Sequence, residues 1–227
     1  RLQAVIDRGR RTLREVRERR VHPPRDDKVL TSWNGLMLRS LAEAAVGLGR
    51  ADYLRAAIDN ANFLLETMRP KGRLLRTYRD GQARLLGYLE DHAFLADSLL
   101  ALYEATFDLR WLGEAISLAG SMVELFWDEG AGVFYDTGVD HETLLVRPRD
   151  IFDNAQPCGG SIASDLLLRL AVATGDQGYA EKGAKPLMGL RELMERAPAG
   201  TGHWLAALDF HVSSPKEIAI VGPKEDP

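Results

Sequence analysis

The sequence has little of what would mark several large classes of protein. Its 227 residues include one cysteine, Cys158, which excludes a framework of internal disulfides and favours a reducing compartment. No apolar run approaches the ~20 residues that cross a bilayer, and the first residues do not form a charged-then-apolar signal segment. We therefore expect a soluble, cytoplasmic protein that does not contact a membrane.

Patterns that bind metals or cofactors are also missing. The five histidines form no ligand-spaced pair, no CxxC motif occurs, and no glycine-rich phosphate loop follows an expected strand. These absences predict no metal and no cofactor. Cys158 lies near an expected helix start, which can lower the pKa of a thiol, but no histidine is close to it in sequence. A small buried residue is therefore the favoured interpretation of Cys158.

Excess positive charge is confined to the start of the chain. Residues 1–20 contain eight arginines and three acids, a net +5, while the whole chain has a net charge of -4. Apolar residues recur among these arginines at helical spacing, at Leu2, Val5, Ile6, Leu13 and Val16. No aromatic residues are interleaved for base stacking, so an amphipathic helix explains the arginines and we expect no nucleic-acid partner.

A repeat organises most of the remaining sequence. In each copy a helix end and a short turn precede an aromatic residue that opens a second helix, with a small residue four positions later. The copies are residues 41–57, 102–115 and 170–184. This layout is typical of helical hairpins whose two helices are antiparallel. The sequence therefore predicts an all-α fold built from three hairpins.

The first helix of each predicted hairpin is the more apolar one. We expect these helices to form an inner layer and to run parallel to one another, with the more charged second helices outside. The predicted inner helices are residues 32–48, 90–106 and 160–174. Two longer links read as β-ribbons: residues 73–87, with a turn at Asp80-Gly81, and residues 132–150, with a looser turn.

The inner helices begin in the most unusual short segments of the chain, so their N-termini predict a shared site on one rim. Carboxylates there suit acid–base chemistry, an indole suits stacking on a sugar, and amides suit hydroxyl groups. The predicted catalytic residues are Asp27, Asp91, His92 and Asp153. The predicted substrate-binding residues are Asp26, Trp33, Asn34, Glu90 and Asn154. Helix capping, loop fixing and helix packing remain alternative roles for the same residues.

Four segments carry a resemblance to a known family: DDKVLTSWNG, LEDHAFLADSLLALYEATFDLRWL, LFWDEGAGVFYDT and DNAQPCGGSIAS. Together they resemble the YyaL or spermatogenesis-associated protein 20 family. The resemblance implies an N-terminal thioredoxin-like domain followed by a six-hairpin (α/α)6 toroid akin to six-hairpin glycosidases and N-acylglucosamine 2-epimerases. On this basis residues 1–210 would be the last three hairpins, and residues 211–227 a strand and tail cut short.

Two functions follow as expectations. The first is carbohydrate chemistry at the rim, either epimerase-like or glycosidase-like. The second is a non-catalytic module that binds a carbohydrate, a peptide or the thioredoxin-like domain. A half-toroid would also leave an apolar face uncovered, so a homo-oligomer or another chain on that face is expected.

Overall fold

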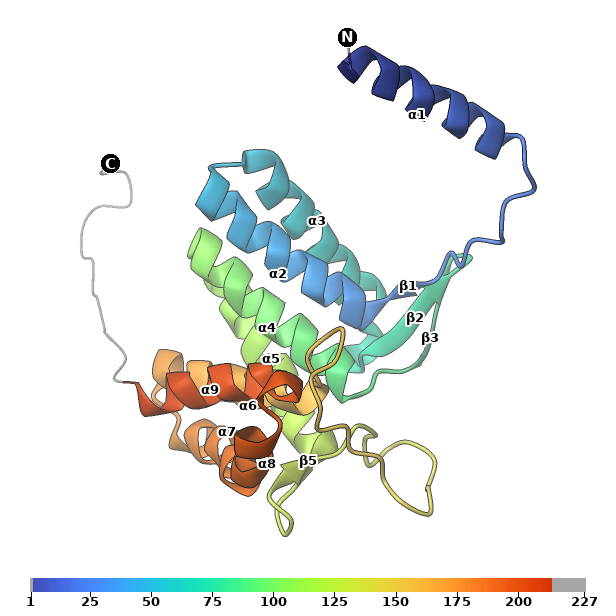
Figure 1. Cartoon of the computed structure of the whole chain (residues 1–227). Helices are drawn as coiled ribbons and strands as arrows, with labels where there is room; N and C mark the ends of the chain where they lie inside the picture. Colours follow the sequence, from blue (N-terminus) through green and yellow to red (C-terminus); the bar gives the residue numbers. More distant parts are fainter. Residues whose placement is uncertain (1, 214–227) are drawn as a thin grey trace.

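Three helical hairpins follow one another in the computed structural model, which describes residues 2–213 (Figure 1). The inner helices are α2 (Thr31–Leu48), α4 (Leu89–Thr106) and α6 (Gly159–Thr174). The outer helices are α3 (Ala51–Thr67), α5 (Leu109–Phe126) and α7 (Gln177–Gly189). The predicted inner helices are confirmed, each beginning one residue earlier than expected.

Short turns hold each pair of helices antiparallel. The inner helices end in the left-handed backbone residues Gly49, Phe107 and Gly175, which turn the chain sharply. In the second and third hairpins an aspartate then caps the outer helix: Asp108 accepts from the Arg110 amide at 3.0 Å, and Asp176 from the Gly178 amide at 2.8 Å. The hairpin geometry therefore follows from residues at the turn itself.

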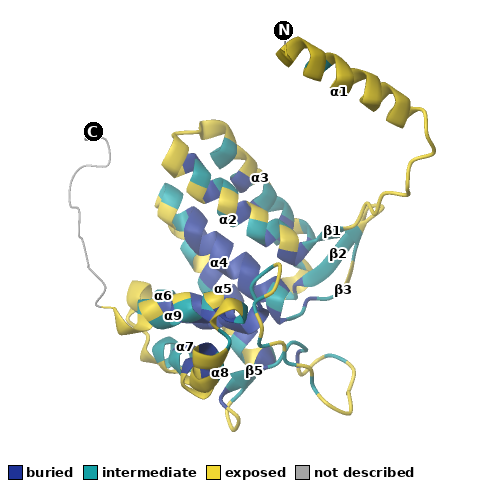
Figure 2. Cartoon of the chain, viewed as in Figure 1, coloured by how far each residue is buried: buried dark blue, intermediate teal, exposed yellow. Residues whose placement is uncertain are grey.

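The three inner helices run parallel, with α4 in the middle. Near their starts, the Ser32 amide of α2 donates to Asp91 of α4. Two turns further along, Arg39 of α2 pairs with Asp97 of α4, so the contacts advance in the same direction on both helices. Helix α4 is buried almost along its whole length, as Figure 2 shows, because α2, α5 and α6 surround it.

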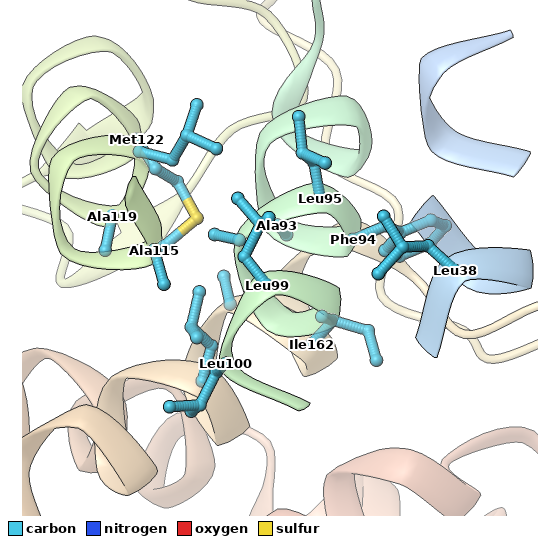
Figure 3. Packing of buried hydrophobic residues seen from close by; sticks show 14 of the residues in the cluster. Leu38, Ala93, Phe94, Leu95, Leu99, Leu100, Ala115, Ala119, Met122 and Ile162 are labelled. Carbon is cyan, nitrogen blue, oxygen red and sulfur yellow. The ribbon is translucent and has the colours of Figure 1, made fainter. Parts of the chain in front are cut away.

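Close packing of the hairpins depends on small residues as much as on leucine. Ala115, Ala119 and Met122 of α5 lie against α4, whose Leu95 and Leu99 are fully buried (Figure 3). Alternating large and small side chains let neighbouring helices interdigitate at the density of a protein interior. This core fixes the positions of the inner-helix N-termini.

Gly35 lies at a tight approach of α2 to α4. A Cβ there would lie 2.9 Å from the Phe94 carbonyl carbon, whereas a Cβ at Gly47 of the same helix would meet no atom within 4 Å. We expect Gly35→Ala to destabilise the protein by about 1–3 kcal/mol through overpacking. Gly47→Ala should be neutral or stabilise by up to about 1 kcal/mol, because alanine favours helix. Chemical denaturation measures both, and equal stabilities would contradict the packing.

One buried carboxylate joins all three inner helices. Asp97 of α4 is 2% exposed and pairs with Arg39 of α2 and, at 2.7 Å, with Arg169 of α6. Arg169 also reaches Glu104 at 2.8 Å, and Arg39 reaches Glu43 at 2.8 Å. The inner layer is therefore cross-linked by charge as well as by apolar packing.

The link between the first two hairpins is the predicted ribbon. Strands β2 (Leu75–Arg79) and β3 (Gln82–Leu86) are antiparallel, and both turn residues, Asp80 and Gly81, have positive φ as an Asp-Gly hairpin turn requires. Strand β1 (Val29–Leu30) pairs with the edge of β2 that does not contact β3. This small sheet leads the chain directly into α2.

The expected ribbon over residues 132–150 is wrong. Within it only β5 (Val133–Phe134) is a strand, and its partner is the preceding β4 (Trp127–Asp128). The rest forms a loop whose base is closed by the Asp136 amide donating to the Pro148 carbonyl at 2.9 Å. Val139 and the apolar residues at the loop tip, Leu144, Leu145 and Val146, are exposed. These residues had suggested a strand, but they do not pack against the core.

Five further elements complete the described chain. Helix α1 (Leu2–Glu18) is amphipathic as expected, but it buries no residue and lies apart from the hairpins (Figure 1). After α7 come α8 (Arg191–Arg196) and α9 (Gly202–Val212), which packs against α6. Short 3-10 turns occur at Pro70–Gly72 and Pro198–Gly200. Residues 211 and 212 end α9, and the strand expected beyond them lies outside the described residues.

Candidate functional site

A cavity of about 560 Å³ opens where the N-termini of the inner helices meet the links. Its walls come from all three hairpins, because α2, the β2–β3 link and the segment before α6 converge there. The lining residues are Leu30, Trp33, Arg76, Tyr88, Glu90, Asp136, Asp150, Asn154, Ala155, Gln156, Pro157, Cys158 and Gly159. The combination of one indole, several carboxylates and two amides is suited to a polar, ring-shaped ligand.

A chain of hydrogen bonds crosses this cavity from one hairpin to the next. The Trp33 indole N–H donates to Gln156 Oε1 at 3.1 Å, and Gln156 Nε2 donates to Glu90 Oε2 at 3.0 Å. Arg76 Nη1 donates to the other Glu90 oxygen at 2.8 Å. The hydrogen bond to Gln156 orients the Trp33 indole. Because Trp33 remains 61% exposed, the face of its ring is accessible.

Arg76 reaches the cavity from β2 and is already engaged on three sides. Besides Glu90 it bonds Asp91 at 3.0 Å, and its guanidinium lies over the Tyr88 ring, 4.7 Å from the centroid. Burial lowers the pKa of Arg76, but the two carboxylates raise it by more than burial lowers it, so the net shift is upward. Arg76 is therefore a fixed, neutralised cation in this wall.

Asp136 is a lining carboxylate whose pKa is raised toward neutrality. Its backbone carbonyl accepts from the Leu89 amide at 3.0 Å, which places it at the start of α4. Its Oδ2 accepts from the Asp150 amide at 2.7 Å. Burial, together with the nearby charges of Asp150 and Glu90, raises the pKa of Asp136 to about 6 despite that hydrogen bond.

Three of the predicted binding residues line the cavity: Trp33, Glu90 and Asn154. They come from the first hairpin, the second hairpin and the link before the third, as the rim hypothesis requires. Asn34, one residue beyond Trp33, instead donates to the Leu30 carbonyl at 2.9 Å and receives the Asn60 amide at its own carbonyl. Asn34 therefore tightens the start of α2 outside the cavity.

The expectation that Asp91 faces a depression is wrong. Its exposed fraction is 0%, and it accepts from the amides of Ser32 and Tyr88 at 2.9 Å each and from Arg76. Burial raises the pKa of Asp91 to about 6, although Arg76 and both amides favour its charged form. Asp91 ties the starts of α2 and α4 together behind the cavity wall.

His92 is also internal. Its Nδ1 lies 3.0 Å from the Tyr88 carbonyl, which can only accept, so Nδ1 carries the proton and Nε2 accepts from Arg73 at 3.2 Å. Burial lowers the pKa of His92 to about 4, which keeps the ring neutral. A catalytic role for His92 is not supported by this placement, because the ring does not line the cavity.

Asp153 caps two helices instead of facing the cavity. Its Oδ1 accepts from the Cys158 amide at 2.9 Å and from the Ser161 hydroxyl at 2.8 Å, at the start of α6. Its Oδ2 accepts from the His203 amide at 2.8 Å, at the start of α9. These bonds align α9 beside α6, which explains the position of an aspartate here without chemistry.

Asp26 and Asp27, the remaining predicted residues, do not line the cavity either. Asp26 pairs with Lys28 at 3.2 Å and Asp27 pairs with Arg25, all in the exposed segment before β1.

Cys158 does line the cavity, but burial raises the pKa of its thiol to about 11, which disfavours a nucleophilic thiolate. Its sulfur instead accepts from the Ser161 amide at 3.4 Å.

Four polar lining residues escaped the sequence argument: Arg76, Asp136, Asp150 and Gln156. Arg76, Asp136 and Asp150 lie in the two links that were predicted to be β-ribbons. In such links, polar residues that alternate with apolar ones are expected on the exposed face, so they do not stand out as site residues. The one available clue was that long links usually have a function. Gln156 lies two residues from Asn154 and could have been included with it.

No group of three or more His, Cys, Asp or Glu in residues 2–213 is placed to hold a metal ion. Over the same residues no helix is both long and apolar enough to cross a bilayer.

Comparison with known sequences shows relatives of the whole chain. The chain is 32% identical to human spermatogenesis-associated protein 20 over 99% of its own length, and 32% identical to the rat protein over 97%. An uncharacterised Caenorhabditis elegans protein is 29% identical over 99% of the chain. The chain spans about 30% of the length of these relatives. No known family model matches it.

Comparison with solved structures shows the fold. Cellobiose 2-epimerase from Spirochaeta thermophila superposes with a TM-score of 0.61 and 18% identity, covering 72% of this chain and 43% of the epimerase. Unsaturated glucuronyl hydrolase from Bacillus sp. GL1 superposes with a TM-score of 0.58 and 17% identity, covering 76% of this chain and 50% of the hydrolase. The three hairpins thus have the fold of a segment of an α/α toroid, and the chain is a homologue of spermatogenesis-associated protein 20 over the part of that protein that it matches.

Proposed function

We propose that the cavity binds a carbohydrate and supports acid–base chemistry on it, of the epimerase or glycoside-hydrolase type. The observation that carries this proposal is the presence of Asp136 and Glu90 in one cavity with an accessible indole. Sugar chemistry commonly uses two carboxylates whose environments hold them in different protonation states. The toroid fold, shared with sugar epimerases and hydrolases, supports the same class by analogy.

The two carboxylates have different surroundings and hence different roles in this proposal. Glu90 accepts from Arg76 and Gln156, so its ionised form is held in place. Asp136, with a pKa near 6, is populated in both protonation states near neutral pH and can donate or accept a proton. Trp33 provides the face on which a sugar ring stacks.

A binding module without catalysis is the alternative, and one observation favours it. Both oxygens of Glu90 are occupied by protein donors, which leaves Asp136 as the carboxylate with a pKa clearly suited to proton transfer. Binding requires only the indole and hydrogen bonds, whereas acid–base catalysis requires a proton to move. Substitution of Asp136, argued in the Discussion, separates the two.

Trp33→Ala should weaken sugar binding about five- to thirtyfold, because stacking on an indole contributes roughly 1–2 kcal/mol. Met37→Ala is the matched control: Met37 lies one turn further along α2, is 57% exposed and does not line the cavity. Titration calorimetry with a panel of neutral mono- and disaccharides would compare both variants with the unchanged chain. Equal losses in the two variants, or no binding of any sugar by the unchanged chain, would contradict the proposal.

A further inference from the structure

The charge of the cavity wall restricts which sugars fit it. Three carboxylates, Glu90, Asp136 and Asp150, line the cavity against one guanidinium, Arg76, which gives the wall a formal charge of -2 when all are ionised. Arg76 is already shared between Glu90 and the buried Asp91, so it has little positive potential left for a ligand. Asp150 accepts from the Phe152 amide and is exposed, without an ion pair in the described part of the chain.

Helix N-termini often attract anions, but here their amides are occupied by the protein. The Ser32 amide of α2 and the Tyr88 amide before α4 both donate to Asp91. The Leu89 amide donates to the Asp136 carbonyl, and the Ser161 amide of α6 to the Cys158 sulfur. These amides are therefore not available to an anionic ligand.

A second arginine does not change the balance. Arg149 lies near Asp136 and Cys158, but it is not part of the cavity lining. Even if its charge offset Asp136 completely, the lining would keep the unpaired carboxylate of Asp150 and the Arg76–Glu90 pair. An acidic sugar placed on Trp33 would thus meet like charge and find no available cation.

Resting on the proposed function, we infer that the cavity selects against acidic sugars and prefers a sugar that carries a protonated amino group. The ammonium group supplies donors and a positive charge to Asp136 and Asp150, which accept from backbone amides but form no ion pair within the described residues. A uronic acid instead brings a fourth carboxylate to a wall that already has three. This preference distinguishes the chain from a binder of unsaturated uronic acid, although both have the same toroid fold.

Three probes test this inference: D-glucosamine, which differs from glucose at C2, D-glucose itself, and D-glucuronate, which differs from glucose at C6. Competition measured by saturation-transfer NMR at pH 7, where Asp136 is mostly ionised, should rank them in that order. Exposed ion pairs support a gain of about two- to fivefold for glucosamine over glucose, and roughly tenfold over glucuronate. The differences should shrink from 0.05 to 0.5 M NaCl, because salt screens them.

Asp150→Asn removes the least-engaged carboxylate and should reduce the glucosamine-to-glucose ratio, while Asp140→Asn, a carboxylate outside the cavity that pairs with Arg73, should leave that ratio unchanged. Glucuronate that binds as tightly as glucosamine would overturn the inference while leaving sugar binding, and hence the proposed function, intact. Binding of none of the three would refute the proposed function and the inference with it.

Discussion

Asp91→Ala is expected to lower the free energy of unfolding by about 3–5 kcal/mol, the cost of removing one partner from a buried charged network. The variant would leave the amides of Ser32 and Tyr88 without their acceptor and would leave Arg76 with Glu90 alone. Each unsatisfied buried group costs about 1–3 kcal/mol. Urea denaturation followed by circular dichroism measures the loss.

A surface aspartate provides the control for that result. Asp52 pairs with Arg50 at 2.6 Å, but half of each side chain is exposed, so Asp52→Ala should shift the midpoint little. Asp91→Asn, which keeps one acceptor oxygen, should fall between the two. The sequence had suggested a catalytic role for Asp91; an Asp91→Ala protein as stable as the unchanged chain would restore that interpretation.

Asp136→Asn is expected to reduce turnover of a sugar substrate by about 10²–10⁴-fold, the usual contribution of a general acid or base. Asparagine can still accept from the Asp150 amide, so the loop base should remain closed and binding should change far less than turnover. Steady-state kinetics on epimerisable disaccharides and aryl glycosides would separate kcat from KM. Unchanged turnover would leave the binding module as the function.

The same variant should become more stable than the unchanged chain at alkaline pH. Because the pKa of Asp136 is raised from 3.8 to about 6 on folding, its ionised form is less favourable in the folded state. The unchanged chain therefore loses stability as pH rises from about 4 to 6, and that loss is complete above pH 6. Asp136→Asn avoids it, by on the order of 1 kcal/mol after solvent screening. Thermal melts at pH 4 and pH 8 test this, and a variant less stable at pH 8 would contradict the raised pKa.

The helices could be predicted because their determinants are local. Apolar periodicity marked α2, α4 and α6, and an aromatic residue after each short turn marked where the outer helices begin. The Asp80-Gly81 turn was recognisable for the same reason, since two residues alone specify its backbone. Parallel inner helices then followed from connectivity, and with them the rim.

The cavity could be predicted only in part. Proximity to an inner-helix N-terminus correctly suggested Trp33, Glu90 and Asn154, but it could not say which acid in a first turn points outward. Glu90 and Asp91 are adjacent, yet one lines the cavity and the other is buried, because helix rotation is set by packing against α2. Asp136 belongs to an irregular loop whose path depends on long-range bonds to the Leu89 and Asp150 amides.

The shared carboxylate of Asp97 sets a minimum size for an independently folding unit. Asp97 meets one arginine from α2 and one from α6, so a pair of hairpins would supply only one of the two guanidinium groups. Removing one partner from a buried charged network costs about 3–5 kcal/mol. In repeat proteins whose neighbours interact only through apolar faces, units can be added or removed one at a time. Here we expect the shared carboxylate to couple α2, α4 and α6, so that the three hairpins unfold together.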